Sequence, residues 1–168
     1  EDFTDDNLKI HYINLINELI VAMSYKENQH PIPCTYIMNP DFLGMIQQNR
    51  DISPVIQGLF EPNSIHVNAQ LAAAMSYVLS NNQSISAEEE QKLNNSAPSF
   101  ADDIFGYIQS INWVMREFGP DIVFGWQFNV WQNATAYWAY ENPDQTTAIA
   151  NSIADFIVLQ REESGVQQ

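Results

Sequence analysis

Two carboxylate side chains of this sequence, Asp41 and Glu162, have the residue type and the position needed for acid–base chemistry. Hydrolysis of a glycosidic bond uses two carboxyl groups, one that protonates the leaving oxygen and one that acts as base or nucleophile. Asp41 is the candidate acid, and Glu162, or its neighbour Glu163, is the candidate base or nucleophile. The alternative is that these are solvated loop residues, since the chain has 21 Asp and Glu.

Amide and aromatic side chains near these carboxylates have the chemistry that binds sugars. Amides both donate and accept hydrogen bonds, so they suit a ligand that is rich in hydroxyl groups. The candidate amides are Asn39, Gln127, Asn129 and Gln160. Trp126 and Trp131 could stack on the apolar face of a sugar ring. The alternative for Trp126 is a place in the core, because large aromatic side chains are mostly buried.

These residues lie at the ends of three segments that we expect to be β-strands: residues 34–39, 121–131 and 155–160. Side chains alternate between the two faces of a strand. On one face, each segment ends in a polar pair: Asn39 with Asp41, Gln127 with Asn129, and Gln160 with Glu162. Ligands bind at the carboxyl ends of parallel strands, so the three pairs predict one polar floor. The alternative is that polar residues simply follow each strand into solvent.

Segments with helical periodicity separate the predicted strands. We expect helices at 5–25, within 41–49, and at 67–79, 100–118 and 144–154, with a long surface connection at 52–68 and a solvated loop or exposed short helix at 81–99. Apolar strands that alternate with amphipathic helices argue for an α/β fold of parallel βαβ units. Phe124 and Trp126 share the face expected to lie under helices, and Val123 and Gly125 share the face expected in a barrel interior.

Two of these segments carry a family resemblance. Residues 36–44, YIMNPDFLG, place Asp41 just after a strand, and residues 124–131, FGWQFNVW, place Gln127 within one. Together they resemble secreted bacterial glycoside-hydrolase-like proteins with a TIM-barrel fold, and residues 155–161 look like the next barrel strand. The resemblance implies a polysaccharide substrate, such as a β-glucan or a chitin-like polymer, and an extracellular or periplasmic location.

The length of the chain limits this barrel. A complete barrel takes about 250 residues, whereas this chain has 168. We therefore predict a single α/β domain over residues 1–168 that forms a partial or fragmentary TIM-like (β/α) barrel. The chain would be a fragment of a longer protein, or another chain would complete the barrel. A smaller doubly wound sheet is the alternative.

The composition argues against several other functions. The chain has 6 Lys and Arg against 21 Asp and Glu, a formal net charge of −15, so we expect it to bind neither nucleic acid nor an anionic membrane. No apolar run is long enough to predict a membrane span. The single cysteine, Cys34, cannot form an internal disulfide or a zinc site built on several thiolates. His11, His30 and His66 lack the spacing of metal ligands, and we predict no metal and no cofactor.

The sequence therefore predicts an extracellular glycoside-hydrolase-like protein that acts on a polysaccharide or an oligosaccharide. Asp41 and Glu162 would carry the acid–base chemistry, and the amides and tryptophans would position the sugar. Two other classes remain open. A non-catalytic carbohydrate-binding or adhesive protein would need Trp131 and the amides without both carboxylates, and a structural, self-assembling subunit would need neither.

Overall fold

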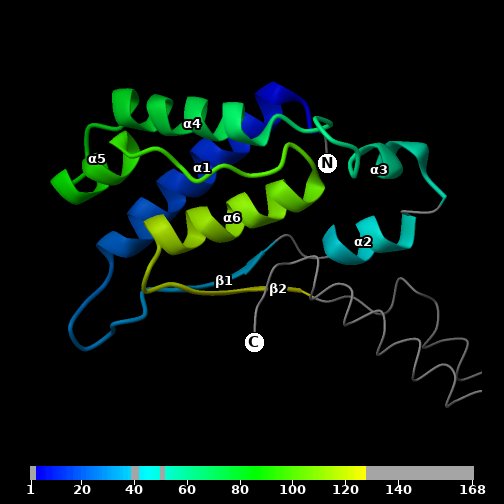
Figure 1. Ribbon diagram of the computed structural model, residues 1–168. Coiled ribbons are helices and arrows are strands. Elements are labelled where there is room, and N and C mark those ends of the chain that lie inside the picture. The colour runs from blue at the N-terminus through cyan, green and yellow to red at the C-terminus, as the bar shows by residue number, and fades with distance from the viewer. Residues whose placement is uncertain (1–2, 39–41, 50–51, 128–168) are drawn as a thin grey trace, which may run out of the picture. The chain divides into compact units, whose positions relative to one another are not determined.

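The computed structural model of the chain describes residues 3–38, 42–49 and 52–127 (Figure 1). By compactness, the chain divides into one unit of Glu1–Tyr36 with Leu59–Phe124 and a second of Ile37–Gly58 with Gly125–Gln168. The elements, in chain order, are α1 (Asp5–Ser24), β1 (Thr35–Met38), α2 (Phe42–Asn49), α3 (Pro54–Gly58), α4 (Val67–Asn81), α5 (Ala87–Asn94), α6 (Ile104–Phe118) and β2 (Val123–Trp126). The single domain expected over residues 1–168 stays a prediction.

The prediction of a partial TIM-like barrel built from parallel βαβ units is wrong. Most of the described residues are helical, and their two strands, β1 and β2, form one parallel sheet. A βαβ unit joins its strands through one crossover helix, but the helices α2 to α6 all lie between β1 and β2. Amphipathic spacing does not reveal what an apolar face packs against. Here α1, α4 and α6 bury much of their apolar surface against one another.

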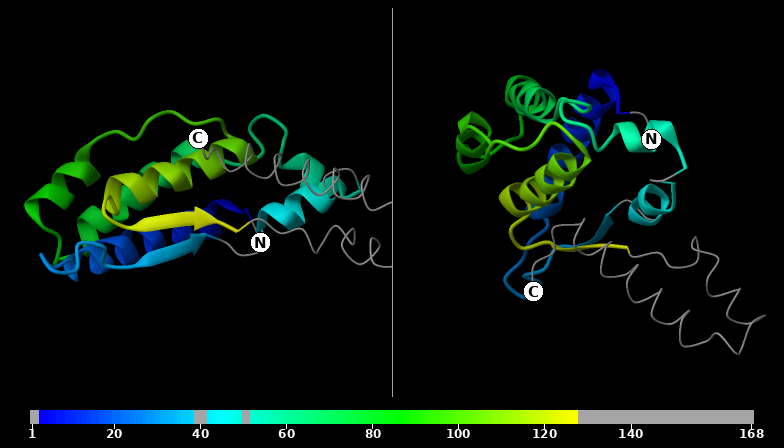
Figure 2. Two further views of the ribbon diagram at one scale, coloured as in Figure 1. Left: turned by 90° about the horizontal axis from the view of Figure 1, so that it is seen from below. Right: turned by 45° about the vertical axis from the view of Figure 1, so that its right-hand side comes forward.

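Three helices form the core of the first unit (Figures 1 and 2). The helix α1 packs along α4, and α6 packs against both. The buried side of α1 consists of Leu8, Tyr12, Leu15, Ile16, Leu19 and Ile20. The residues of α6 that are buried include the periodic set Ile104, Tyr107, Ile108, Ile111, Val114 and Met115. These are the positions at which the sequence repeats with helical spacing, so both helix predictions are confirmed.

Side chains at the helix ends determine where α5 and α6 begin. Asp103 Oδ1 accepts a hydrogen bond from Gly106 N at 2.9 Å and caps α6. The helix α5 begins with a capping box, in which Ser86 Oγ accepts from Glu89 N and Glu89 Oε2 accepts from Ser86 N. This helix lies where the sequence left open a solvated loop or an exposed short helix. The long connection predicted for residues 52–68 contains the short helix α3.

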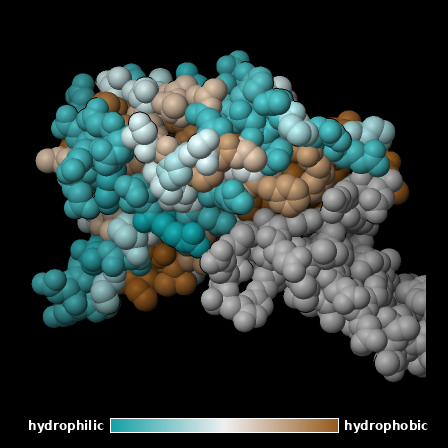
Figure 3. All heavy atoms as spheres, in the orientation of Figure 1, coloured by the Kyte–Doolittle hydropathy of each residue, from teal (hydrophilic) through white to brown (hydrophobic). Residues whose placement is uncertain are grey.

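The strands β1 and β2 lie side by side and run in the same direction (Figure 2). Burial alternates along each of them, so that Phe124 and Trp126 share the covered side, as predicted. Val123 is 51% exposed and Gly125 is also exposed, so the expectation that they line a barrel interior is wrong. Figure 3 shows hydrophobic atoms beneath the start of the strands, beside the hydrophilic loop that precedes β1.

Candidate functional site

The carboxyl ends of β1 and β2 form the candidate site. Because the two strands are parallel neighbours, the chain leaves both of them at the same edge of the sheet. The last residue of β1 is Met38, and Asn39 is the next residue in the sequence. The last residue of β2 is Trp126, and Gln127 follows it. The pairing of the strands therefore places Met38 and Trp126, the last residues of the two strands, at one edge of the sheet.

An apolar cluster supports this edge on its covered side. Met38 and Trp126 are both buried there, with 5% and 8% of their surface exposed. The ring of Phe42, at the start of α2, lies against Trp126 with 6.1 Å between the ring centroids and a tilt of 36°. Leu43 and Ile46 of the same helix are buried as well. This packing holds the end of β2 in place, because aromatic pairs contribute more than the area they bury.

The other side of the same edge is open. Ile37 of β1 is 66% exposed, and Gly125 of β2 is exposed. A methyl group placed on Gly125 would meet no atom within 4 Å. A ligand could therefore approach the ends of both strands from this side, with little side-chain bulk in its way.

The structure describes two of the predicted site residues. Trp126 is a core residue beside Phe42, so its ring face is not presented to solvent in this arrangement. Gln127 is half-buried and takes part in an interaction of its own. The remaining predicted residues lie outside the described residues: Asn39, Asp41, Asn129, Trp131, Gln160, Glu162 and Glu163.

The electrostatics of the edge follow from its composition. Within residues 37–38, 42–49, 52–58 and 125–127 no side chain is titratable. Acid–base chemistry at this edge would therefore need carboxylates from elsewhere in the sequence, such as Asp41. In the part of the chain that the structure describes, no three His, Cys, Asp or Glu side chains gather as metal ligands do. Every helix described is too short or too polar to cross a lipid bilayer.

Sequence reasoning missed a second group of polar residues, in the first unit (Glu1–Tyr36 with Leu59–Phe124), which we call the helical unit. Glu88 and Lys92 belong to the segment predicted as a solvated loop or an exposed short helix, and Lys26 follows the first predicted helix. All three line one cleft. The scarcity of basic residues was a usable signal for the two lysines, because the chain has only 6 Lys and Arg. Sequence spacing alone does not reveal that Lys26 and Lys92, which are far apart in the sequence, line the same cleft.

No protein-family model matches this chain, and the comparisons with curated proteins and with solved structures gave no match either.

Proposed function

We propose that this chain binds a polysaccharide at the carboxyl ends of β1 and β2 and hydrolyses its glycosidic bonds. Asp41 would act as the acid and Glu162 as the base or nucleophile, while Asn39, Gln127, Asn129, Trp131 and Gln160 would hold the sugar. An extracellular location belongs to the same proposal, since polymeric substrates of this kind are met outside the cell.

The observation that carries the proposal is the parallel pairing of β1 with β2. Both strands end at one edge of the sheet, which is where α/β sheets bind ligands. We propose that the residues after Met38 and after Trp126 act at this edge. The amide of Gln127 can both donate to and accept from a sugar hydroxyl. Trp126 supports this edge from its covered side and would contribute to binding through the packing of Phe42 rather than by stacking on the sugar.

Binding and turnover should be measured separately on the purified chain. Binding is followed as retention on insoluble cellulose, chitin and β-1,3-glucan, and turnover as release of reducing ends. We expect Gln127→Ala and Trp131→Ala to weaken retention by about tenfold, as the loss of a hydrogen bond or a stacking contact implies. Asp41→Asn should keep retention and abolish turnover, because the amide cannot donate the acid's proton.

A matched control keeps this test specific. Gln70 of α4 is half-buried like Gln127 but lies in the helical unit, so Gln70→Ala should leave both retention and turnover unchanged. Retention without release of reducing ends would remove the hydrolytic step and leave a carbohydrate-binding or adhesive protein. Filaments or oligomers that form with neither activity would contradict the whole proposal and favour a structural subunit.

A further inference from the structure

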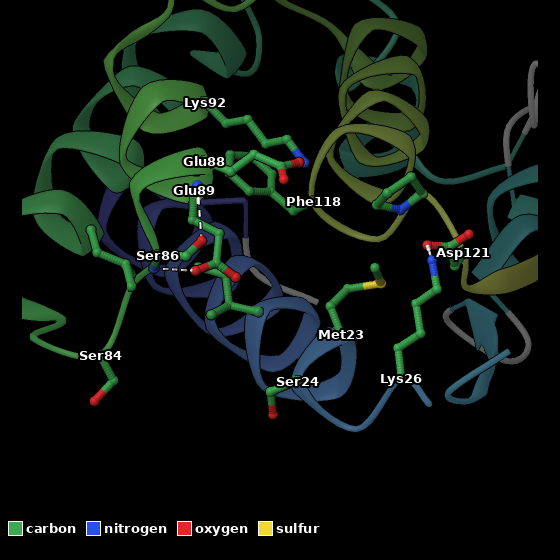
Figure 4. A pocket seen from close by; sticks show the side chains of 13 residues that line it. Met23, Ser24, Lys26, Ser84, Ser86, Glu88, Glu89, Lys92, Phe118 and Asp121 are labelled. Atoms are coloured by element: carbon green, nitrogen blue, oxygen red, sulfur yellow. Dashed lines mark hydrogen bonds and ion pairs between the residues drawn. The ribbon is translucent and has the colours of Figure 1, made fainter. Parts of the chain in front are cut away.

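A cleft of about 560 Å³ opens in the helical unit, and all the residues that line it belong to that unit (Figure 4). It lies between the end of α1, the start of α5 and the residues that follow α6. Its apolar lining includes Ile20 and Met23 of α1 and Phe118 of α6. Ile20 and Phe118 are almost completely buried, at 6% and 3% exposure, so they form a fixed floor.

Two ion pairs stand on opposite sides of this cleft (Figure 4). Lys26 Nζ lies 2.6 Å from Asp121 Oδ2, and Lys92 Nζ lies 2.9 Å from Glu88 Oε1. The Lys92 side chain is only 21% exposed, whereas that of Glu88 is 76% exposed, so the lysine lies inside the cleft and the carboxylate at its rim. The hydrogen bond from Lys92 lowers the pKa of the Glu88 carboxyl.

The start of α5 is also part of the cleft and is held in a defined geometry. Glu89 and Ser86 line the wall, and their reciprocal hydrogen bonds form the capping box of the helix. The positions of Glu88 in the first turn and of Lys92 in the last turn are thereby set by the backbone of α5. The cleft thus combines a fixed apolar floor with donors and acceptors on rigid elements, which is the composition of small-ligand sites.

The charges in the cleft define the kind of ligand it can take. Each ammonium group already has a carboxylate partner, so an anion would have to break an ion pair and would also face the carboxylate of Glu89. A cation would compete with Lys26 and Lys92 for the same carboxylates. A neutral ligand with many hydroxyl groups can donate to the carboxylates and accept from the ammonium groups while both pairs stay intact.

We propose that this cleft is a second carbohydrate subsite, which takes a neutral sugar unit of the polysaccharide. The apolar face of the ring would lie over Met23, and its hydroxyls would bond to Lys26, Lys92 and their carboxylate partners. The subsite rests on the proposed function, because it serves the same substrate class. It would hold the polymer independently of the edge formed by β1 and β2.

The methionine methyl groups allow the two sites to be observed separately. Met23 lines the cleft, whereas Met38 is the last residue of β1 at the edge of the sheet. The full chain would be labelled with ¹³C at its methionine methyl groups, with each signal assigned by a Met→Leu variant. Neutral hexasaccharides of cellulose, chitin and β-1,3-glucan would then be titrated, with inorganic phosphate and sulfate as charged probes.

We expect a neutral hexasaccharide to shift the Met23 signal in a saturable way. Lys92→Ala should weaken that titration by about tenfold, since a charge-assisted hydrogen bond to the sugar is lost. Lys9→Ala is the matched control, because Lys9 is also a lysine of the helical unit but lies over the Tyr77 ring, outside the cleft. This control should titrate like the original chain, and the melting temperatures of both variants should show that they are folded.

Three results would overturn this inference, and they separate it from the proposed function. A sugar that shifts Met38 and leaves Met23 unchanged would contradict the second subsite and support binding at the sheet edge. A Met23 signal that responds to phosphate or sulfate and not to neutral sugars would show an anion site. No response of either methionine would contradict both proposals. A response of Met23 alone would support the subsite and contradict binding at the edge.

Discussion

The Tyr12 hydroxyl donates a hydrogen bond to Ser110 Oγ at 2.5 Å, and this bond joins α1 to α6 inside the helical unit. The direction of the bond follows from the second contact of the serine. Ser110 Oγ donates its only hydrogen to the carbonyl oxygen of Tyr107 at 2.7 Å, so it must accept from Tyr12. Both side chains have no exposed surface, and each polar atom of the pair is satisfied within the protein.

This relationship predicts an asymmetry between two substitutions. Ser110→Ala leaves the Tyr12 hydroxyl buried without its partner, so the free energy of unfolding should fall by about 2–3 kcal/mol. Tyr12→Phe removes one donor and leaves Ser110 bonded to Tyr107, so it should cost about 1 kcal/mol. Urea unfolding of both variants and of the double variant measures these losses in the free energy of unfolding. Equal losses for the two single variants would contradict the assigned direction of the bond.

Alkaline pH should destabilise the protein through the same tyrosine. Burial raises the pKa of the Tyr12 hydroxyl above its ordinary value of 10.0, because the charged phenolate would lose its contact with water. Above about pH 10 the unfolded chain loses this proton and the folded chain keeps it, so the free energy of unfolding falls as pH rises. Its slope should approach about 1.4 kcal/mol per pH unit from this residue.

Tyr12→Phe isolates that contribution from the other tyrosines. The variant should show a flatter decline in the free energy of unfolding between about pH 10 and pH 11.5, although it is less stable near neutral pH. Urea unfolding of both proteins across this range provides the measurement. If the two proteins lost stability in parallel, Tyr12 would not be the group responsible.

Local sequence patterns predicted the elements of this protein better than they predicted the fold. The apolar residues of α1, from Leu8 to Ile20, recur every three or four positions, and a helix is the one structure that places them on one side. Prolines at 31, 33 and 40 bound the segment that contains β1. Both signals depend on neighbours in the sequence, which is why they succeeded.

The fold class and the site depend on contacts that such patterns do not contain. The pairing of Tyr12 with Ser110 spans 98 positions, and nothing in either segment identifies the other. An apolar helix face packs equally well on a sheet or on another helix. The sequence pattern therefore did not show that the helices pack mainly on one another, and the βαβ interpretation is wrong. The polar floor expected after Met38 and Trp126 stays a prediction. The cleft around Lys92 is absent from the sequence prediction, because its residues come from the ends of three separate helices and from the loops beside them.

Gly106, in the first turn of α6, is expected to tolerate no side chain. A Cβ atom there would lie 1.7 Å from the carbonyl oxygen of Ala101, because the chain before α6 folds closely over the helix start. Backbone on both sides leaves little room to relax, so Gly106→Ala should lower the free energy of unfolding by on the order of 3 kcal/mol. Gly58→Ala is the control, since a Cβ atom there meets nothing within 4 Å. Comparable losses of melting temperature in the two variants would contradict the close approach.

Asn68, near the start of α4, forms hydrogen bonds with Phe100 and Asp102 in the segment that precedes α6. Its Nδ2 donates to the Phe100 carbonyl oxygen at 2.8 Å and to Asp102 Oδ1 at 3.0 Å, and its Oδ1 accepts from Phe100 N at 2.9 Å. Asp102 Oδ1 also accepts from the backbone N of Asn68 at 3.2 Å. The N-cap residue of α4, His66, makes no side-chain capping bond, so the carboxylate of Asp102 satisfies this end of the helix instead.

Replacement of Asn68 should therefore loosen this segment. Asn68→Ala leaves the partly buried amide and carbonyl groups of Phe100 without this partner, and we expect a loss of about 2 kcal/mol in the free energy of unfolding. Asn81→Ala is the matched control in the same helix, because its Nδ2 bonds only to the exposed Tyr77 carbonyl, and it should change stability by less than about 0.5 kcal/mol. Hydrogen exchange should accelerate at Phe100 in Asn68→Ala and stay unchanged at Val78, near the far end of α4. Slow exchange at Phe100 in the variant would show that other contacts hold the segment, because the bond between its amide and Asn68 Oδ1 is then absent.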